Sequence, residues 1–354
     1  MSLPEWRKEI DKIDEQVLQM LNRRAELAQQ IGHAKSHTRS HYFTPEREHT
    51  VFKRLLSLNK GPLEANAVRA VYREVISACL ALEKPLAVAF LGPEGTFSHL
   101  ASIAKFGTSS AFHPVDSITD VFAQIERNVC DYGIVPVENT LAGVIPETLD
   151  TFMNSNLRVV SEVYQPITHN LLTHCESLEQ VKRLYYHFQP LAQCRQWLRN
   201  HLSQVEEVET SSTAKSAELA AQDKESAAIA TSLASEKYGV PILCKHIEDN
   251  PANRTRFLVL GYNEPEPTGR DKTSLMFSVH NRAGELVHAL NAFEKYDVNM
   301  TMIESRPIKT AAWQYIFYID VQGHTKDASV TKAINLLKEH SLFVRVLGSY
   351  PEAT

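Results

Sequence analysis

Hydrophobic positions recur with a helical period through residues 4–84. Steps of three and four place apolar side chains on one face of a first long helix, at Ile10, Ile13, Val17, Met20, Leu27 and Ile31. Thr44 and Pro45 suit the start of a second helix, which Asn59-Lys60-Gly61-Pro62 ends. A third helix is expected from Glu64 to Glu83, closed by Pro85. Because so small a helical segment cannot bury its stripe alone, we expect a partner, most simply a second copy.

After Leu86 the pattern changes, and short apolar runs alternate with helical stretches as far as Tyr262. The runs lie at 86–91, 133–137, 157–160, 227–230 and 257–260. This alternation is typical of α/β layering. We expect two lobes around a cleft, with a ligand at the carboxyl ends of the strands.

Residues 263–272 are polar and rich in proline and glycine, which favours a linker. Beyond them the pattern predicts strand 273–280, helix 284–296, strand 298–305, strand 313–321, helix 326–340 and strand 342–348. That order is the ferredoxin-like βαββαβ arrangement. The predicted domains are therefore 1–85, 86–262 and 273–354, and the fold class is multidomain: all-α, then two-lobed α/β, then ferredoxin-like.

Composition excludes several classes of function. The chain has 354 residues and a net charge of -5, so no basic surface argues for nucleic acid. No apolar run reaches the roughly 18 residues that a membrane span needs. Five scattered cysteines, without C-x-x-C spacing, argue against a disulfide framework or a zinc site. The first residues lack the plan of a signal peptide, and we expect a cytoplasmic protein without a metal.

A glycine turn follows the first apolar run of the α/β region. Gly92-Pro93-Glu94-Gly95-Thr96-Phe97-Ser98 leads into a helical stretch from Leu100. Glycines allow a tight turn, and free N–H groups at a helix start face an anion. An ordinary strand-to-helix turn has equal weight from this motif alone.

Two cations interrupt the apolar stripe of the first helix. Arg24 occupies the same heptad position as Ile10 and Val17, and Lys35 lies within roughly 20° of it. Cations on an apolar face are costly unless an anion pairs with them, which favours a site for a small anion over snorkelling side chains. Arg7 lies too far along the helix to meet Lys35 in one chain, but it could reach an antiparallel partner's site.

With these positions, residues 4–84 resemble the all-helical, intertwined-dimer chorismate mutase family. The resemblance implies that Arg24 and a partner arginine clamp the two substrate carboxylates, and that Lys35 hydrogen-bonds the ether oxygen. Arg47 would help to hold a carboxylate and Glu48 the ring hydroxyl. Catalysis would be conformational trapping with electrostatic stabilisation.

The third helix departs from that family at two positions. Several members have Ser where this chain has Cys79, and Gln where it has Glu83. A carboxylate beside the ether oxygen would repel its developing negative charge. We therefore hypothesise that Glu83 acts as a neutral acid that donates a hydrogen bond, with mutase activity favouring mildly acidic pH.

Four polar clusters follow in the α/β region. They are Pro136-Val137-Glu138-Asn139-Thr140, His187-Phe188-Gln189-Pro190 with Gln193-Cys194, Ser211-Ser212-Thr213, and Asn253-Arg254-Thr255-Arg256-Phe257. Taken alone, the third is best interpreted as a helix cap, and the fourth is equally well a surface loop.

Together with the glycine turn, these clusters resemble the prephenate dehydratase domain over residues 86–262. The resemblance implies a two-lobed fold similar to type II periplasmic binding proteins, and expulsion of the ring hydroxyl and carbon dioxide from prephenate. Thr255 would donate a hydrogen bond to the leaving hydroxyl, and Arg256 would pair with a substrate anion. The cleft would be lined by Thr96, Asn139, Gln193 and Ser211.

Residues 273–350 resemble the ACT domain, a ferredoxin-like sensor of small ligands. Two motifs carry the resemblance, Asn281-Arg282-Ala283-Gly284-Glu285-Leu286 and Glu304-Ser305-Arg306-Pro307. It implies that L-phenylalanine binds between paired domains and inhibits allosterically. The expected effector-binding residues are Asn281, Gly284, Leu286, Glu304, Ser305 and Arg306. A dimerisation domain without ligand is the alternative.

The sequence thus predicts a homo-oligomeric bifunctional enzyme that converts chorismate to prephenate and prephenate to phenylpyruvate, inhibited by phenylalanine. Neither step needs a metal or organic cofactor. Two alternatives stay open: a dehydratase whose helical segment is a degenerate dimerisation module, and a non-catalytic sensor of amino acids.

Overall fold

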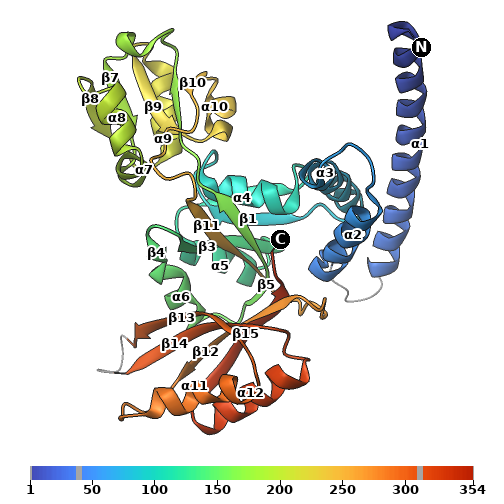
Figure 1. The fold of residues 1–354 in the computed structure, drawn as a ribbon, viewed down its shortest axis with the longest axis vertical. Helices are drawn as coiled ribbons and strands as arrows, with labels where there is room; N and C mark the ends of the chain where they lie inside the picture. Colours follow the sequence, from blue (N-terminus) through green and yellow to red (C-terminus); the bar gives the residue numbers. More distant parts are fainter. Residues whose placement is uncertain (1, 37–41, 309–313, 354) are drawn as a thin grey trace. The chain divides into compact units, whose positions relative to one another are not determined.

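A computed structural model describes residues 2–36, 42–308 and 314–353, and the chain forms two compact units (Figure 1). The first unit comprises Met1–Ala87 with Phe106–Ala111, and the second comprises Val88–Lys105 with Phe112–Thr354. Within the described ranges, no helix is both long and apolar enough to cross a membrane.

The first unit contains the three helices that the hydrophobic period predicts: α1 (Leu3–Ser36), α2 (Pro45–Leu58) and α3 (Ala65–Glu83). Thr44 holds the N-cap position of α2, although its hydroxyl makes no capping bond there. The carboxyl-terminal part of α1 packs on α3, whereas every side chain from Leu3 to Arg23 is exposed. The apolar stripe of α1 is therefore uncovered within one chain, and Met20 is 66% exposed.

The second unit begins with a two-lobed α/β region, as predicted. The first sheet has the order β2-β1-β3-β11-β5, with β4 paired to β3, and the second has the order β10-β6-β9-β7-β8. The first lobe contains β1 (Ala87–Leu91), α4 (Phe97–Phe106), β2 (Ala111–Val115), α5 (Ile118–Glu126), β3 (Tyr132–Asn139), β4 (Gly143–Val144), α6 (Pro146–Phe152), β5 (Arg158–Pro166) and β11 (Arg254–Gly261). The second contains β6 (Asn170–Thr173), a short 3-10 helix (Leu178–Gln180), β7 (Arg183–Tyr186), α7 (Phe188–Gln193), α8 (Arg195–His201), β8 (Glu206–Glu209), α9 (Thr213–Gln222), β9 (Ser226–Ala230), α10 (Ser232–Tyr238) and β10 (Ile242–Cys244).

The chain crosses between the lobes twice. It leaves the first sheet after β5 through residues 167–169 and returns from β10 through residues 245–253. The returning strand, β11, inserts antiparallel between β3 and β5. Polar residues at the start of β11 therefore lie beside the carboxyl end of β3, where Thr255 faces Asn139 across the ladder.

The last part of the chain is a four-stranded antiparallel sheet with two helices, which confirms the βαββαβ prediction. Its strand order is β13-β14-β12-β15. The elements are β12 (Asp271–Ser278), α11 (Glu285–Lys295), β13 (Met300–Pro307), β14 (Tyr315–Gln322), α12 (Ala328–Glu339) and β15 (Phe343–Pro351). The expected strand start at residue 313 lies outside the described residues. Phe277, Phe293 and Leu337 contribute to the core between sheet and helices.

The segment 263–272 is docked on its neighbours, although its composition predicts a linker. Pro265 is buried, and its carbonyl accepts a hydrogen bond from Nε2 of His324 at 3.0 Å. Glu264 pairs with Arg158 at 2.7 Å. These contacts restrain the connection between the dehydratase-like region and the last sheet.

Strand β15 lies against β5 so closely that only glycine fits at Gly348. A Cβ atom there would lie 2.0 Å from the carbonyl oxygen of Val159. We expect Gly348→Ala to destabilise the second unit by about 1–3 kcal/mol, because the two strands must separate. Thermal unfolding measures this, with Gly61→Ala as the control, since the nearest atom to a Cβ at Gly61 is 3.9 Å away. Equal midpoints for the two variants would show that the strands do not pack this closely.

Candidate functional site

A network of polar side chains lies where the chain crosses between the two lobes. Nδ2 of Asn139 is 2.9 Å from Oγ1 of Thr255 and 2.9 Å from Oδ1 of Asn253. Nδ2 of Asn253 donates in turn to Oε1 of Gln193, at 3.1 Å. The fold therefore brings together Asn139, Gln193 and Thr255, which belong to three separate sequence clusters.

The orientation of the Asn139 amide determines what Thr255 can do. Oδ1 of Asn139 accepts the backbone N–H groups of Leu141 and Ala142, at 3.0 and 2.9 Å. Its NH₂ group must then face Thr255, whose oxygen accepts. The proton of the Thr255 hydroxyl is consequently available to an acceptor in the site, although Thr255 itself is only 8% exposed.

His169 belongs to this network, and the sequence analysis did not identify it. Its Nε2 lies 2.7 Å from Oε1 of Gln193, and its ring packs edge-on against Phe97, with centroids 5.4 Å apart. Burial lowers the pKa of His169, so the imidazole is neutral at pH 7. Because a carbonyl oxygen only accepts, Nε2 carries the proton. Nδ1 is buried without a hydrogen-bond partner in the described part of the chain.

The glycine turn reaches this network through Phe97 rather than through Thr96. The Thr96 hydroxyl donates to the carbonyl of Pro93 at 2.9 Å, and among the described residues no hydrogen bond joins it to Thr255. Gly95 adopts a φ of 88°, and its carbonyl accepts from Oγ1 of Thr231 at 2.6 Å, in the second lobe. The role of Thr96 in binding substrate stays a prediction.

The hydroxyl cluster before α9 divides into a cap and an exposed residue. Oγ of Ser212 accepts the backbone N–H of Lys215 at 3.1 Å, so the capping interpretation holds for Ser212. Ser211 is exposed next to that cap, and its role in binding substrate stays a prediction.

Arg256 does not face the network, and the expectation that it holds a substrate anion stays a prediction. Side chains alternate between the faces of a strand, so Thr255 and Arg256 point to opposite sides of β11. The Arg256 guanidinium is buried and is paired with the carboxylates of Glu162 and Asp320. A substrate carboxylate would have to displace one of them.

The first unit gathers four of the predicted mutase residues between α1 and α3. Nζ of Lys35 lies 3.3 Å from Oε2 of Glu83, and Nη1 of Arg24 donates to the carbonyl of Val75 at 3.4 Å. Cys79 lies one turn from each of Val75 and Glu83, on the same face of α3, and is 6% exposed. The protonated form of Glu83 stays a hypothesis.

The other predicted mutase residues lie farther out. On α2, Arg47 is exposed and Glu48 is half-buried. Arg7 is exposed on the uncovered part of α1, roughly 42 Å along the helix axis from Lys35. One chain therefore does not bring Arg7 to Lys35.

The predicted effector residues of the last sheet lie in two places. Asn281, Gly284 and Leu286 surround the start of α11, where Gly284 adopts a φ of 87°. Glu304, Ser305 and Arg306 lie on β13, an edge strand. Arg306 pairs with Asp150 of α6 through two contacts, at 3.1 and 3.3 Å. Its guanidinium therefore binds the neighbouring α/β region, which differs from the expectation that it binds the effector.

Three family models match the chain in succession: chorismate mutase type II over residues 6–84, prephenate dehydratase over 88–265 and the ACT domain over 273–337. A bifunctional chorismate mutase/prephenate dehydratase of Aquifex aeolicus is 46% identical, across 99% of this chain and 98% of its own length. That of Stutzerimonas stutzeri is 40% identical, across 98% and 97%. The solved prephenate dehydratase of Arthrobacter aurescens, in complex with L-Phe, is 33% identical with a TM-score of 0.70, and covers 75% of this chain and 90% of its own.

Proposed function

Since this chain belongs to the family of bifunctional chorismate mutase/prephenate dehydratases, we propose how its residues carry out the two reactions. It is an enzyme of phenylalanine biosynthesis. Its mutase domain converts chorismate to prephenate, and its dehydratase domain converts prephenate to phenylpyruvate with loss of water and carbon dioxide.

In the dehydratase reaction, Thr255 donates a hydrogen bond to the ring hydroxyl as it leaves. The observation that carries this role is the Asn139 amide, which is held by two backbone N–H groups and directs its NH₂ at Oγ1 of Thr255. That bond turns the threonine proton outward. Aromatisation of the ring drives the reaction, so a donor at the leaving group is the main chemical help required. Gln193 bonds both His169 and Asn253, and so joins the two segments that cross between the lobes beside Thr255.

In the mutase reaction, the ammonium group of Lys35 stabilises the negative charge that develops on the ether oxygen. Two observations support this role: Lys35 lies in the last turn of α1, and its Nζ is 3.3 Å from Oε2 of Glu83 on α3. Arg24 binds a substrate carboxylate from the same helix. The rearrangement needs no proton transfer, so the residues act by orientation and charge.

We further propose that two copies complete each mutase site. The exposed apolar stripe of α1 supports an antiparallel pairing, in which Arg7 of one chain reaches Lys35 of the other. Burial of this stripe supplies the association free energy, and the paired cations then share one bound dianion.

A single assay distinguishes the bifunctional enzyme from a dehydratase with a degenerate helical module and from a non-catalytic sensor. The full-length protein is given chorismate, and prephenate and phenylpyruvate are followed over time. We expect both to appear in succession. Turnover of added prephenate alone would identify the helical unit as a degenerate dimerisation module, and no turnover at all would identify a binding protein.

L-phenylalanine is the proposed effector, and it binds at the turn before α11 together with β13. The left-handed φ of Gly284 and the exposed Ser305 support this position. We expect Gly284→Val to raise the phenylalanine concentration for half-inhibition by at least about tenfold, since a β-branched residue is strained in that conformation. Enzyme inhibition and the thermal shift caused by L-phenylalanine measure it.

The matched control for this variant is Gly269→Val. Gly269 also has a positive φ, 83°, but a Cβ there would touch nothing within 4 Å, and the residue lies outside the proposed effector site. Equal phenylalanine sensitivity of the two variants would contradict binding at the Gly284 turn.

A further inference from the structure

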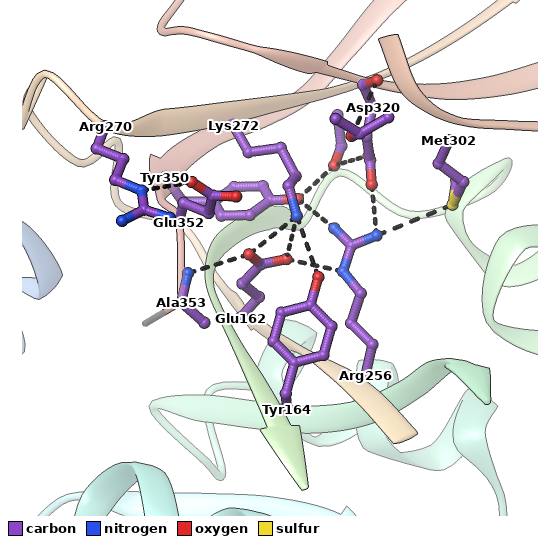
Figure 2. Close-up of polar contacts among 12 residues, drawn as sticks. Glu162, Tyr164, Arg256, Arg270, Lys272, Met302, Asp320, Tyr350, Glu352 and Ala353 are labelled. Carbon is purple, nitrogen blue, oxygen red and sulfur yellow. Dashed lines mark hydrogen bonds and ion pairs between the residues drawn. The ribbon is translucent and has the colours of Figure 1, made fainter. Parts of the chain in front are cut away.

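Four charged side chains form a buried network between the dehydratase region and the ACT domain (Figure 2). Nε of Arg256 lies 2.7 Å from Oε2 of Glu162, and Nη1 of Arg256 binds Oδ2 of Asp320. Nζ of Lys272 lies 3.0 Å from both Glu162 oxygens. Each of the four residues is at most 4% exposed. Two cations thus balance two carboxylates, which makes this four-charge network neutral.

Neutral groups complete a closed ring of hydrogen bonds around Arg256. Its Nη2 donates to the hydroxyl of Tyr350 at 3.0 Å, and that hydroxyl lies 2.6 Å from Oγ of Ser274. Ser274 donates to Oδ1 of Asp320, because a carboxylate only accepts, so Tyr350 donates to Ser274. Burial raises the pKa of Tyr350, which keeps its hydroxyl protonated. The orientation of the guanidinium is therefore determined on three sides.

The partners of Arg256 come from both domains. Glu162 lies on β5 of the dehydratase region, whereas Asp320 lies on β14, Tyr350 on β15 and Met302 on β13 of the ACT domain. The Met302 sulfur is 3.9 Å from Nη1. Three strands of the ACT sheet thus contact one side chain of β11.

The residue before Arg256 on β11 is Thr255. Because consecutive side chains point to opposite faces of a strand, Arg256 reaches the ACT domain while Thr255 reaches the polar network with Asn139. The two side chains therefore share one stretch of the β11 backbone and lie on its opposite faces.

We propose that Arg256 is a positioning residue through which the ACT domain holds Thr255 in its productive place. The inference rests on the proposed dehydratase function. Effector binding that shifts β12, β14 or β15 changes the four-charge network and thereby the alignment of Thr255 with the leaving hydroxyl. Deletion of residues 270–354 would remove Asp320, Lys272 and Tyr350 together and leave only the Arg256–Glu162 pair, so point variants are needed as the test.

The experiment uses full-length Asp320→Asn, which keeps the shape of the side chain and removes its charge. Dehydratase kcat and KM with prephenate, half-inhibition by L-phenylalanine and mutase turnover are measured on one preparation. We expect kcat to fall about tenfold or more with KM within about twofold, because misalignment of Thr255 affects the chemical step. The phenylalanine concentration for half-inhibition should rise at least about fivefold. Mutase turnover, which belongs to the other unit, should not change.

Glu352→Gln is the matched control. It removes a carboxylate of the same domain that pairs with Arg270 at 2.8 Å, but does not touch Arg256. We expect wild-type values for all measurements. Tyr350→Phe removes only the hydroxyl that Arg256 binds. If Asp320→Asn does not fold, the same kinetic measurements on Tyr350→Phe test the positioning role of Arg256.

The outcomes separate this inference from the proposed function. A wild-type kcat or a wild-type response to L-phenylalanine in a folded Asp320→Asn or Tyr350→Phe variant overturns the positioning role, as does an effect on KM alone. Absence of prephenate turnover in the wild-type protein would instead overturn the proposed dehydratase function.

Discussion

Thr255→Val removes dehydratase turnover and leaves mutase turnover intact. Valine has nearly the volume of threonine and fits the buried site, which is 8% exposed, but it has no hydroxyl to donate. Loss of one positioned hydrogen-bond donor costs about 10²–10³-fold in rate, so we expect kcat with prephenate to fall by that factor. Conversion of prephenate to phenylpyruvate measures it, with chorismate consumption by the same preparation as a test of folding.

Two further variants sharpen this result. Thr255→Ser keeps the hydroxyl and should retain most of the turnover, whereas Thr119→Val removes a hydroxyl whose nearest partner is Thr151 on α6 and should behave as wild type. If Thr255→Val retained turnover within tenfold of wild type, the leaving hydroxyl would have another donor. His169 and Asn139 would then be the next residues to substitute.

Two inactive mutase variants restore activity when they are mixed. Arg7→Ala and Lys35→Ala should each lower mutase kcat by about 10²–10³-fold, because Lys35 stabilises the charge that develops on the ether oxygen and Arg7 holds a substrate carboxylate in place. In a mixed dimer, one site takes Lys35 from the first variant and Arg7 from the second, and is complete. Random exchange of subunits therefore restores about a quarter of wild-type activity, since half of the dimers are mixed and each has one complete site.

The control for this experiment is a mixture of Arg24→Ala with Lys35→Ala. Arg24 and Lys35 lie on the same α1 and belong to the same site. In a mixed dimer one site therefore lacks Arg24 and the other lacks Lys35, so no complete site forms. Activity in this control equal to that of the Arg7 mixture would contradict the sharing of sites. No recovery in the Arg7 mixture, with dimers shown by sedimentation, would place Arg7 outside the mutase site.

Local patterns predicted the elements of this protein well, because helices and strands are stabilised by the periodic burial of side chains. The three helices before Leu86, the alternation beyond it and the final βαββαβ order all follow from hydrophobic spacing. The polar residues at strand ends were also recognisable. Asn139, Gln193 and Thr255 come from separate clusters, and the structure joins them in one network.

His169 and the direction of Arg256 were not predictable in this way. His169 stands alone before the apolar pair Leu171-Leu172, and its relation to Gln193 depends on how β6 and α7 pack. Arg256 follows Thr255 directly, so their motif suggests a shared role. The alternation of a strand separates them, and the ACT domain supplies the partners of Arg256 from residues far along the chain.

The sequence by itself determined the order of the domains, the types of their elements and the residue types available for two reactions on dianionic substrates. Those properties depend on spacing and chemistry that are local to each segment. Only the tertiary structure decided which of these residues meet: Thr255 with Asn139, Lys35 with Glu83, and Arg256 with Asp320 and Tyr350 of the last sheet. Pairings between distant residues depend on packing and on the balance of buried charge, and neither is contained in any one stretch of the chain.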